Sequence, residues 1–145
     1  MPYNLVLDAS AVIKWFIRED EYTEMCEIRD LFIEGKLEIY IPSLLFTEFI
    51  NALRYTSGIT AGDVVKALNA LKTLRLNVVN DLDLLPEAVE IAFNADITVY
   101  DAIYVALAKA TKSKLITYDA KLLSKFDSLA MRASQILKQI ARRET

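Results

Sequence analysis

The chain has 145 residues, near the commonest size of one domain, so we expect a single domain spanning residues 1–145. A hydrophobic content of 54% excludes a disordered chain, and the lack of histidine, with Cys26 as the only cysteine, excludes histidine-based catalysis, histidine-ligated zinc and intramolecular disulfides. A formal net charge of −3 argues against a nucleic-acid binder unless bound cations reverse the local sign.

The first part of the chain alternates between strand and helix patterns. In order, it predicts a strand over 3–7, a helix over 11–17, a helix over 22–34 that ends at Gly35, a strand over 38–41, and a helix from Pro42-Ser43 to about Tyr55. The opening residues carry no basic leader, and no apolar run approaches the ~18 residues that cross a bilayer. We therefore expect a cytoplasmic protein without membrane contact.

The second part continues the alternation. A capping box at Thr60–Asp63 starts a helix to about Leu74, followed by a strand over 77–79, helices over 86–94 and 98–110, a strand over 114–117 and a last helix over 134–143. Short strands that alternate with helices predict an α/β fold with a mainly parallel sheet covered on both faces. In such sheets ligands bind beyond the carboxyl ends of the strands.

Four acidic residues lie in or beside apolar stretches: Asp8, Glu48, Asp101 and Asp119. Acidic side chains belong on solvated faces unless their charge is compensated, and a divalent cation is the obvious compensation. Asp8 and Asp119 each follow the end of a predicted strand. If those two strands are neighbours, both carboxylates meet at one rim of the sheet.

Each of these acids also has an ordinary structural explanation. Asp8 suits the N-cap of the helix that follows it, Asp101 lies three residues after Thr98 as in a capping box, and Asp119 suits the cap of a short helix over 120–124. Glu48 suits a solvent-facing helix position. These explanations stay open individually, but they do not explain why the caps fall at the same predicted edge of the sheet.

Four segments together resemble the motif blocks of the PIN domain, especially in VapC-type toxin ribonucleases. They are Leu7-Asp8-Ala9-Ser10 with Ala-Val-Ile-Lys-Trp-Phe after it, Pro42-Ser-Leu-Leu-Phe-Thr-Glu48-Phe-Ile-Asn51, Ile97-Thr-Val-Tyr-Asp101-Ala-Ile-Tyr, and Leu115-Ile-Thr117-Tyr-Asp119-Ala-Lys-Leu. The blocks occur in the order of the family and span nearly the whole chain.

The resemblance implies an α/β/α sandwich with a central parallel sheet and a divalent-metal-dependent endoribonuclease activity. It implies a catalytic, metal-binding set formed by Asp8, Glu48, Asp101 and Asp119, supported by the hydroxyls of Ser10 and Thr117 and by Asn51. Asp96 matches no motif position.

Carboxylate oxygens select Mg²⁺ or Mn²⁺, which act on phosphodiesters without histidine. We expect one or two ions, with Asp8 and Asp101 as direct ligands. Glu48 and Asp119 either complete the shell or hold water. Substrate phosphates could meet Lys14, Arg18 or Arg54 near the same edge, or the basic stretch of Lys109, Lys112 and Lys114, although a solvated helix face is the favoured explanation for each of these cations. Tyr100 and Tyr104 suit stacking on RNA bases, or packing in the core.

The resemblance also implies partners. A VapC-type toxin acts on RNA, pairs with a small VapB-type antitoxin and forms a homodimer. Apolar faces that carry Trp15, Phe16, Phe32 and Phe46 could receive the antitoxin or be plain core. A housekeeping role in RNA processing stays open.

Two rival functions remain. A haloacid-dehalogenase-like, aspartate-based phosphatase needs Asp-x-Asp, where this chain has Ser10 in the second position. A non-catalytic module that binds RNA or a protein is the other, although four carboxylates would repel the phosphate that such a module must hold.

Overall fold

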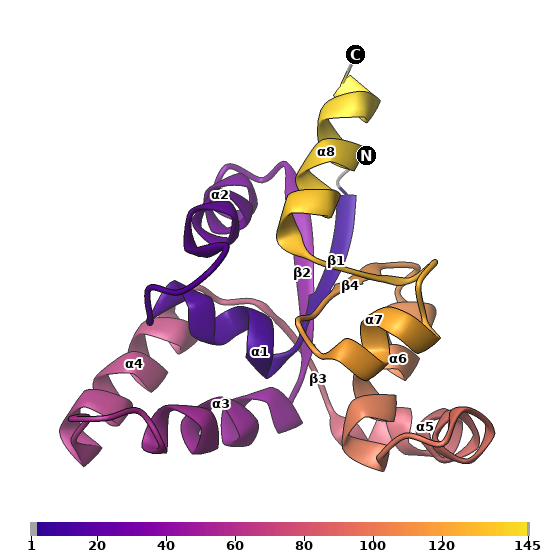
Figure 1. Cartoon of the computed structure of the whole chain (residues 1–145), viewed down its shortest axis with the longest axis horizontal. Helices are drawn as coiled ribbons and strands as arrows, with labels where there is room; N and C mark the ends of the chain where they lie inside the picture. Colours follow the sequence, from indigo (N-terminus) through magenta and orange to yellow (C-terminus); the bar gives the residue numbers. More distant parts are fainter. Residues whose placement is uncertain (1–2, 145) are drawn as a thin grey trace.

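A single five-stranded sheet forms the centre of the molecule in the computed structural model, which describes residues 3–144 (Figure 1). The strands lie in the order β3-β2-β1-β4-β5, and every pairing is parallel. Their bounds are β1 (Tyr3–Leu7), β2 (Leu37–Pro42), β3 (Asn77–Val79), β4 (Lys114–Ile116) and β5 (Ala130–Met131).

Helices cover the sheet on both sides. They are α1 (Ala9–Val12), continued by the 3₁₀ turn η1 (Ile13–Trp15), and α2 (Tyr22–Ile33), α3 (Leu44–Arg54), α4 (Ala61–Thr73), α5 (Asp81–Ala95), α6 (Val99–Ala110), α7 (Ala120–Lys125) and α8 (Ala133–Glu144). In Figure 1, α1 to α4 lie on one side of the sheet and α5 to α7 on the other. The predicted α/β/α sandwich is therefore confirmed.

The central strand β1 explains where the ligand edge lies. Leu5, Val6 and Leu7 are fully buried, as expected of a strand with both faces covered. Leu7 is paired with Ile116 of β4, and the amide of Asp8 donates to the Ile116 carbonyl at 3.3 Å. The carboxyl ends of β1 and β4 are thus neighbours, as the rim prediction for Asp8 and Asp119 requires.

Helix α5 shows where local pattern reading was wrong. It begins at Asp81, five residues before the predicted start, and Pro86 lies inside it. The Asn80 side chain caps it by accepting from the amide of Leu82 at 3.0 Å, while Asp81 accepts from the amide of Leu44 at 2.9 Å. These contacts fix the helix start despite the proline, which has no amide to donate in the helix. The two-residue strand β5 was not predicted either.

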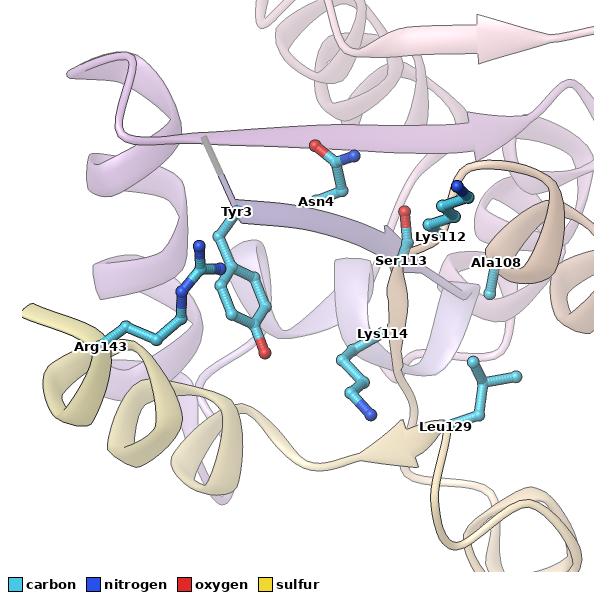
Figure 2. Close-up of a pocket in the computed structure, with 8 residues that line it drawn as sticks. All are labelled: Tyr3, Asn4, Ala108, Lys112, Ser113, Lys114, Leu129 and Arg143. Atoms are coloured by element: carbon cyan, nitrogen blue, oxygen red, sulfur yellow. The ribbon is translucent and has the colours of Figure 1, made fainter. Parts of the chain in front are cut away.

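The amino ends of β1 and β4 face the opposite edge of the sheet. There Tyr3, Asn4 and Lys114 help to line a separate pocket (Figure 2). Within residues 3–144 no single helix meets the length and hydropathy of a membrane span; α5 and α6 meet them only when taken together, and they are bent by 115° at their junction.

Candidate active site

A pocket of about 250 Å³ lies beyond the carboxyl ends of the central strands. Its walls include all four predicted acids and two of the three predicted supporting residues, from α1, α3, α6 and the loops after β1 and β4: Asp8, Glu48, Asp101, Asp119, Ser10 and Asn51. Residues from the two halves of the sequence therefore converge on one site. Tyr104 lines the pocket as well.

Asp8 is the most enclosed of the acids, with 7% of its surface exposed. Its Oδ1 accepts from the Ser10 hydroxyl at 2.6 Å and from the Ala11 amide at 3.1 Å, and its Oδ2 accepts from the Thr117 hydroxyl. Burial raises the pKa of Asp8 to about 6, because the charge loses solvation. The three hydrogen bonds oppose that rise, and the charge of Asp101 adds to it.

The helix-cap explanations are correct for Asp8 and Asp119, and for Asp101 one of the two hydrogen bonds of the expected capping box is present. They do not compete with a site. Asp8 caps α1 through the Ala11 amide, and Asp119 caps α7 by accepting from the Leu122 amide at 3.0 Å. Thr98 caps α6 by accepting from the Asp101 amide at 3.1 Å. Capping fixes where each acid stands at the sheet edge, and the same three acids still line the pocket.

Glu48 is held by a contact that sequence reasoning did not find. The hydroxyl of Tyr104 donates to Glu48 Oε1 at 2.6 Å. Burial raises the pKa of Glu48, as do the charges of Asp101 and Asp81, whereas the Tyr104 hydrogen bond lowers it. Only 1% of Tyr104 is exposed, so it cannot stack on a base, and its place beside Ile103 on a buried helix face was the available signal. Tyr100, in contrast, is exposed.

Asp101 is electrostatically coupled to each of the other three acids. Burial is the largest cause of its own raised pKa, and the charge of Asp119 adds to it. Its charge in turn raises the pKa of both Asp8 and Glu48. Mutual repulsion of this kind stores free energy that a bound cation releases.

Ser10 and Thr117 connect the pocket to a wider polar network. Ser10 Oγ accepts from the Tyr118 amide at 2.9 Å, and Thr117 Oγ1 accepts from the Asp119 amide at 3.1 Å. Each hydroxyl thus touches both strand ends, since each also donates to Asp8. Thr117 is fully buried behind the pocket.

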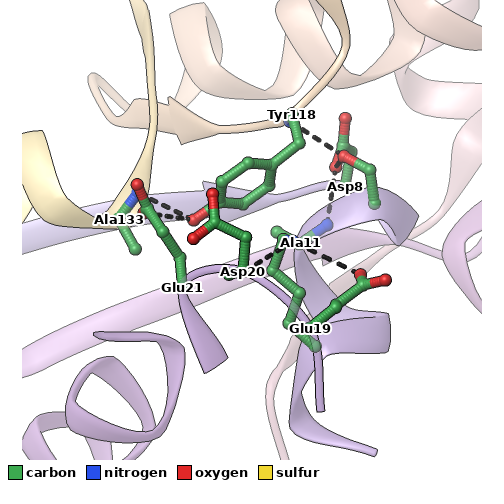
Figure 3. A network of polar contacts seen from close by, with 9 residues as sticks. Asp8, Ala11, Glu19, Asp20, Glu21, Tyr118 and Ala133 are labelled. Atoms are coloured by element: carbon green, nitrogen blue, oxygen red, sulfur yellow. Dashed lines mark hydrogen bonds and ion pairs between the residues drawn. The ribbon is translucent and has the colours of Figure 1, made fainter. Parts of the chain in front are cut away.

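Tyr118 extends this network to the start of α8 (Figure 3). Its hydroxyl donates to Glu21 Oε1 at 2.7 Å and accepts from the Ala133 amide at 3.1 Å. Glu21 also accepts from the amide and hydroxyl of Ser134. Burial would raise the pKa of Glu21, but these hydrogen bonds outweigh it and lower the pKa. The loop before α2, the end of β4 and α8 are fastened together beside the site.

None of the cations expected near this edge lines the pocket. Lys14 is buried, with 6% of its surface exposed, and its ammonium group lies 4.2 Å from the centre of the Tyr118 ring. It donates to the Asp20 carbonyl and forms an ion pair with Glu19. Lys14 is therefore a structural cation, and Arg18 and Arg54 also lie outside the pocket wall.

The acids suit a hard divalent cation by donor type. Within the described part of the chain, no three acidic or cysteine side chains stand close enough to form a ready-made cage. Mg²⁺ does not require one, because it is commonly held by one or two carboxylates and keeps several waters. Asp8 accepts three hydrogen bonds of the roughly four that its two oxygens can accept, so it retains capacity for an ion.

Comparison with known proteins agrees with this geometry. The chain is 33% identical over 133 residues to Ribonuclease VapC3 of Pyrobaculum aerophilum, covering 87% of this chain and 97% of that protein. The crystal structure of PAE2754 from Pyrobaculum aerophilum matches with a TM-score of 0.71 at 23% identity, over 97% of this chain and 90% of that one. A toxin–antitoxin complex from Klebsiella pneumoniae matches with a TM-score of 0.65 at 19% identity, over 89% and 97% of the two chains.

The family model for the PIN domain matches residues 5–129, a stretch that contains most of β1, all of β2, β3 and β4, and the four acids. This match covers most of the chain and includes the whole pocket wall. The chain belongs to the PIN domain family.

Proposed function

We propose that this protein is a divalent-metal-dependent endoribonuclease of the VapC type, which hydrolyses RNA phosphodiester bonds at the acidic pocket. The observation that carries the proposal is the convergence of Asp8, Glu48, Asp101 and Asp119 on one pocket at the ligand-binding edge of a parallel sheet. The name of the relative, Ribonuclease VapC3, supports the same reaction class.

Asp8 and Asp101 hold the cation, Mg²⁺ or Mn²⁺, as one ion or two. When bound, such a cation supplies positive charge to the phosphate and promotes ionisation of water. The Ser10 and Thr117 hydroxyls keep the Asp8 carboxylate oriented, because they fix both of its oxygens from two different strand ends. A carboxylate held this way loses little conformational entropy when the ion binds.

Glu48 and Asp119 complete the acidic wall, either as ligands or by accepting hydrogen bonds from ordered water. Tyr104 fixes one oxygen of Glu48 and leaves the other available. Asn51 lies three residues after Glu48 on the same face of α3 and also lines the pocket. Its amide group supplies a hydrogen-bond donor for a phosphate oxygen in a wall that otherwise consists mainly of acceptors.

As the toxin of a pair, the protein would bind a VapB-type antitoxin in the cytoplasm. The Klebsiella pneumoniae neighbour, a toxin–antitoxin complex, supports this role. A mainly apolar pocket between η1, α3 and α4, lined by Phe16, Ile17, Leu53 and Ile59 among others, has a volume of about 580 Å³ and suits an apolar antitoxin segment. Trp15 does not contribute to such a groove, because it is buried and its indole donates to the Met25 carbonyl.

A homodimer is the proposed assembly. One face of α5 exposes large apolar side chains at helical spacing, with Leu82 70% exposed, Val89 45% and Phe93 83%. A second copy of the chain would cover this stripe. Phe93→Lys should therefore shift the protein toward monomer in sedimentation experiments, whereas an unchanged dimer would place the interface elsewhere.

RNA cleavage by purified protein tests the activity. We expect fragments with Mg²⁺ or Mn²⁺, none in excess chelator, and loss of at least about a hundredfold in rate for Asp101→Asn. Full cleavage with chelator present would contradict the proposal. RNA binding without cleavage would favour the binding module, and a covalent aspartyl-phosphate on Asp8 would favour the phosphatase. Growth arrest on expression, relieved by the product of a small adjacent open reading frame, would identify a toxin.

A further inference from the structure

The second pocket of interest lies at the other end of β1 from the acidic site. It has a volume of about 440 Å³, and its wall carries three cations and no acid: Lys112 from the turn after α6, Lys114 from β4 and Arg143 from α8 (Figure 2). Tyr3, Asn4 and Ser113 contribute polar groups. We refer to this hollow as the basic pocket.

Among the described residues, no acidic side chain lines the basic pocket. Within residues 3–144, none of the three cations forms an ion pair with a carboxylate. Lys114 instead donates to the Ser128 carbonyl at 2.6 Å, and the Arg143 guanidinium lies 5.0 Å from the centre of the Tyr3 ring. Like charges that line one hollow repel each other, and an anion bound among them would reduce this repulsion.

Helix-end electrostatics explains Lys112 and Arg143 separately, because Lys112 follows the end of α6 and Arg143 lies in the last turn of α8, but it does not explain Lys114. Lys112 stands at the end of α6 with a left-handed backbone (φ 52°), where a cation interacts favourably with the helix dipole but glycine is the usual residue. Lys114 lies in a strand and Arg143 comes from a different helix. Their convergence on the same hollow is therefore not a consequence of one helix terminus.

The sheet itself leaves room for a ligand at this place. Strand β4 pairs with β1 only from Leu5 onward, so Tyr3 and Asn4 have a strand partner on the β2 side but none on the β4 side. The Asn4 amide group bridges part of this gap by donating to the Thr111 carbonyl at 3.2 Å. The basic pocket thus lies where the start of β1 lacks a strand partner, and cationic side chains line it.

We propose that the basic pocket is a binding site for a phosphate ester, the phosphate of an RNA strand or of a free nucleotide. Arg143 and the two lysines supply charge-assisted hydrogen bonds, and the volume admits a nucleotide-sized group. Without a metal, the acidic pocket would repel the same phosphate ligand. The two pockets therefore lie at opposite ends of β1 and carry opposite charge. The RNA arm of this inference rests on the proposed ribonuclease function, whereas the nucleotide arm does not.

Amide chemical shifts of the full chain, followed by NMR in excess chelator, test the site directly. The probes are adenosine 5′-monophosphate and a short single-stranded polyuridine. We expect saturable shifts at Asn4, Ser113 and Leu129 with at least one probe, and affinity weakened about tenfold or more in Lys112→Gln/Arg143→Gln. The matched control, Lys66→Gln/Lys72→Gln on α4, removes the same net charge away from the pocket and should bind as wild type does.

The two probes separate the sources of the phosphate. Shifts with polyuridine identify an RNA strand. In that case the slope of log affinity against log salt concentration should also become shallower in the variant, by about 0.7 for each lost phosphate contact. Shifts with the nucleotide alone identify a free nucleotide. No shift at the basic pocket with either probe, or equal weakening in the control, overturns the site even where RNA cleavage is intact. Binding here in a protein that cleaves no RNA would leave the site standing and remove the proposed function.

Discussion

The Thr117 hydroxyl donates to Asp8 Oδ2, 109 positions away in the sequence, and this hydrogen bond joins the loops that follow the neighbouring strands β1 and β4. Thr117 is fully buried, and its oxygen also accepts from the Asp119 amide. One hydroxyl therefore sets the positions of two of the four acids. The expected consequences concern stability, metal affinity and rate.

Thr117→Val tests this hydroxyl. The change keeps the shape of the side chain but leaves one Asp8 oxygen and the Asp119 amide without their partner, which should lower the free energy of unfolding by about 1–3 kcal/mol. It should also raise the pKa of Asp8 further, because a hydrogen bond that favours the carboxylate is lost. Urea unfolding measures the first effect. Unchanged stability would mean that water replaces the hydroxyl at no cost.

The metal-free protein should become less stable as the pH rises, because Asp8 then loses a proton that the folded state binds more tightly than the unfolded state. The pKa of Asp8 is raised to about 6 in the folded protein from an ordinary 3.8, so the folded state binds the proton more tightly than the unfolded state between these values. This proton binding contributes about 3 kcal/mol to the free energy of unfolding. The contribution is fully present below about pH 4 and is lost as the pH rises through 6. Asp8→Asn should abolish most of this slope in unfolding experiments with chelator. A wild-type slope that survives in the variant would assign it to other acids.

Metal binding should release protons in the acid range. Near pH 5.5 the ion must displace a proton from Asp8, whereas at pH 8 the carboxylate is already ionised. The apparent affinity for Mn²⁺ should therefore weaken as the pH is lowered below about 6. Titration calorimetry in buffers of different ionisation enthalpy counts the protons. Equal proton release at both pH values would show that Asp8 is not a ligand.

The Tyr104 and Glu48 pair should act as a unit. Tyr104→Phe removes the hydrogen bond to Glu48 Oε1 and should reduce the cleavage rate by about tenfold, with about 1 kcal/mol lost in stability. In a double-mutant cycle, Tyr104→Phe should have little further effect on rate once Glu48 is changed to Gln. Additive effects of the two substitutions would show that Tyr104 acts on the site by another route.

Glu21 provides a contrast, since it fastens α8 without lining the pocket. Glu21→Gln should lower stability, because Tyr118 and Ser134 lose a charged acceptor, while the affinity for Mn²⁺ stays within about twofold of wild type. The wild-type contribution should be lost as the pH falls through the lowered pKa of Glu21. A large loss of metal affinity would show that the network around Tyr118 positions the acids as well.

The features that could be predicted from the sequence are those that depend on hydrophobic periodicity and on where strands end. The strand over 77–79 was predicted at its observed bounds, and the rim formed by Asp8 and Asp119 followed from parallel topology once β1 and β4 were neighbours. Of the two alternatives for Tyr104, packing in the core is correct and base stacking is wrong, as its place beside Ile103 on an apolar helix face indicated. The bond from Tyr118 to Glu21, 97 positions apart, leaves no local pattern in the sequence.

The basic pocket illustrates the same limit. Lys112 and Lys114 were visible as a basic stretch, but the predicted fold gave no reason to place Arg143 beside them. Its position depends on how α8 returns to the start of β1, beside which this helix lies in Figure 1. Tertiary packing of the last helix, rather than any motif, builds this wall.

Crystals soaked in Mn²⁺ test the central claim most directly, because anomalous scattering locates the ion without reference to activity. We expect a peak within coordination distance, about 2.0–2.3 Å, of carboxylate oxygens of Asp8 and Asp101, and no such peak in Asp8→Asn/Asp101→Asn crystals. No peak in this pocket at saturating Mn²⁺, or a peak that persists in the double variant, would contradict the central claim.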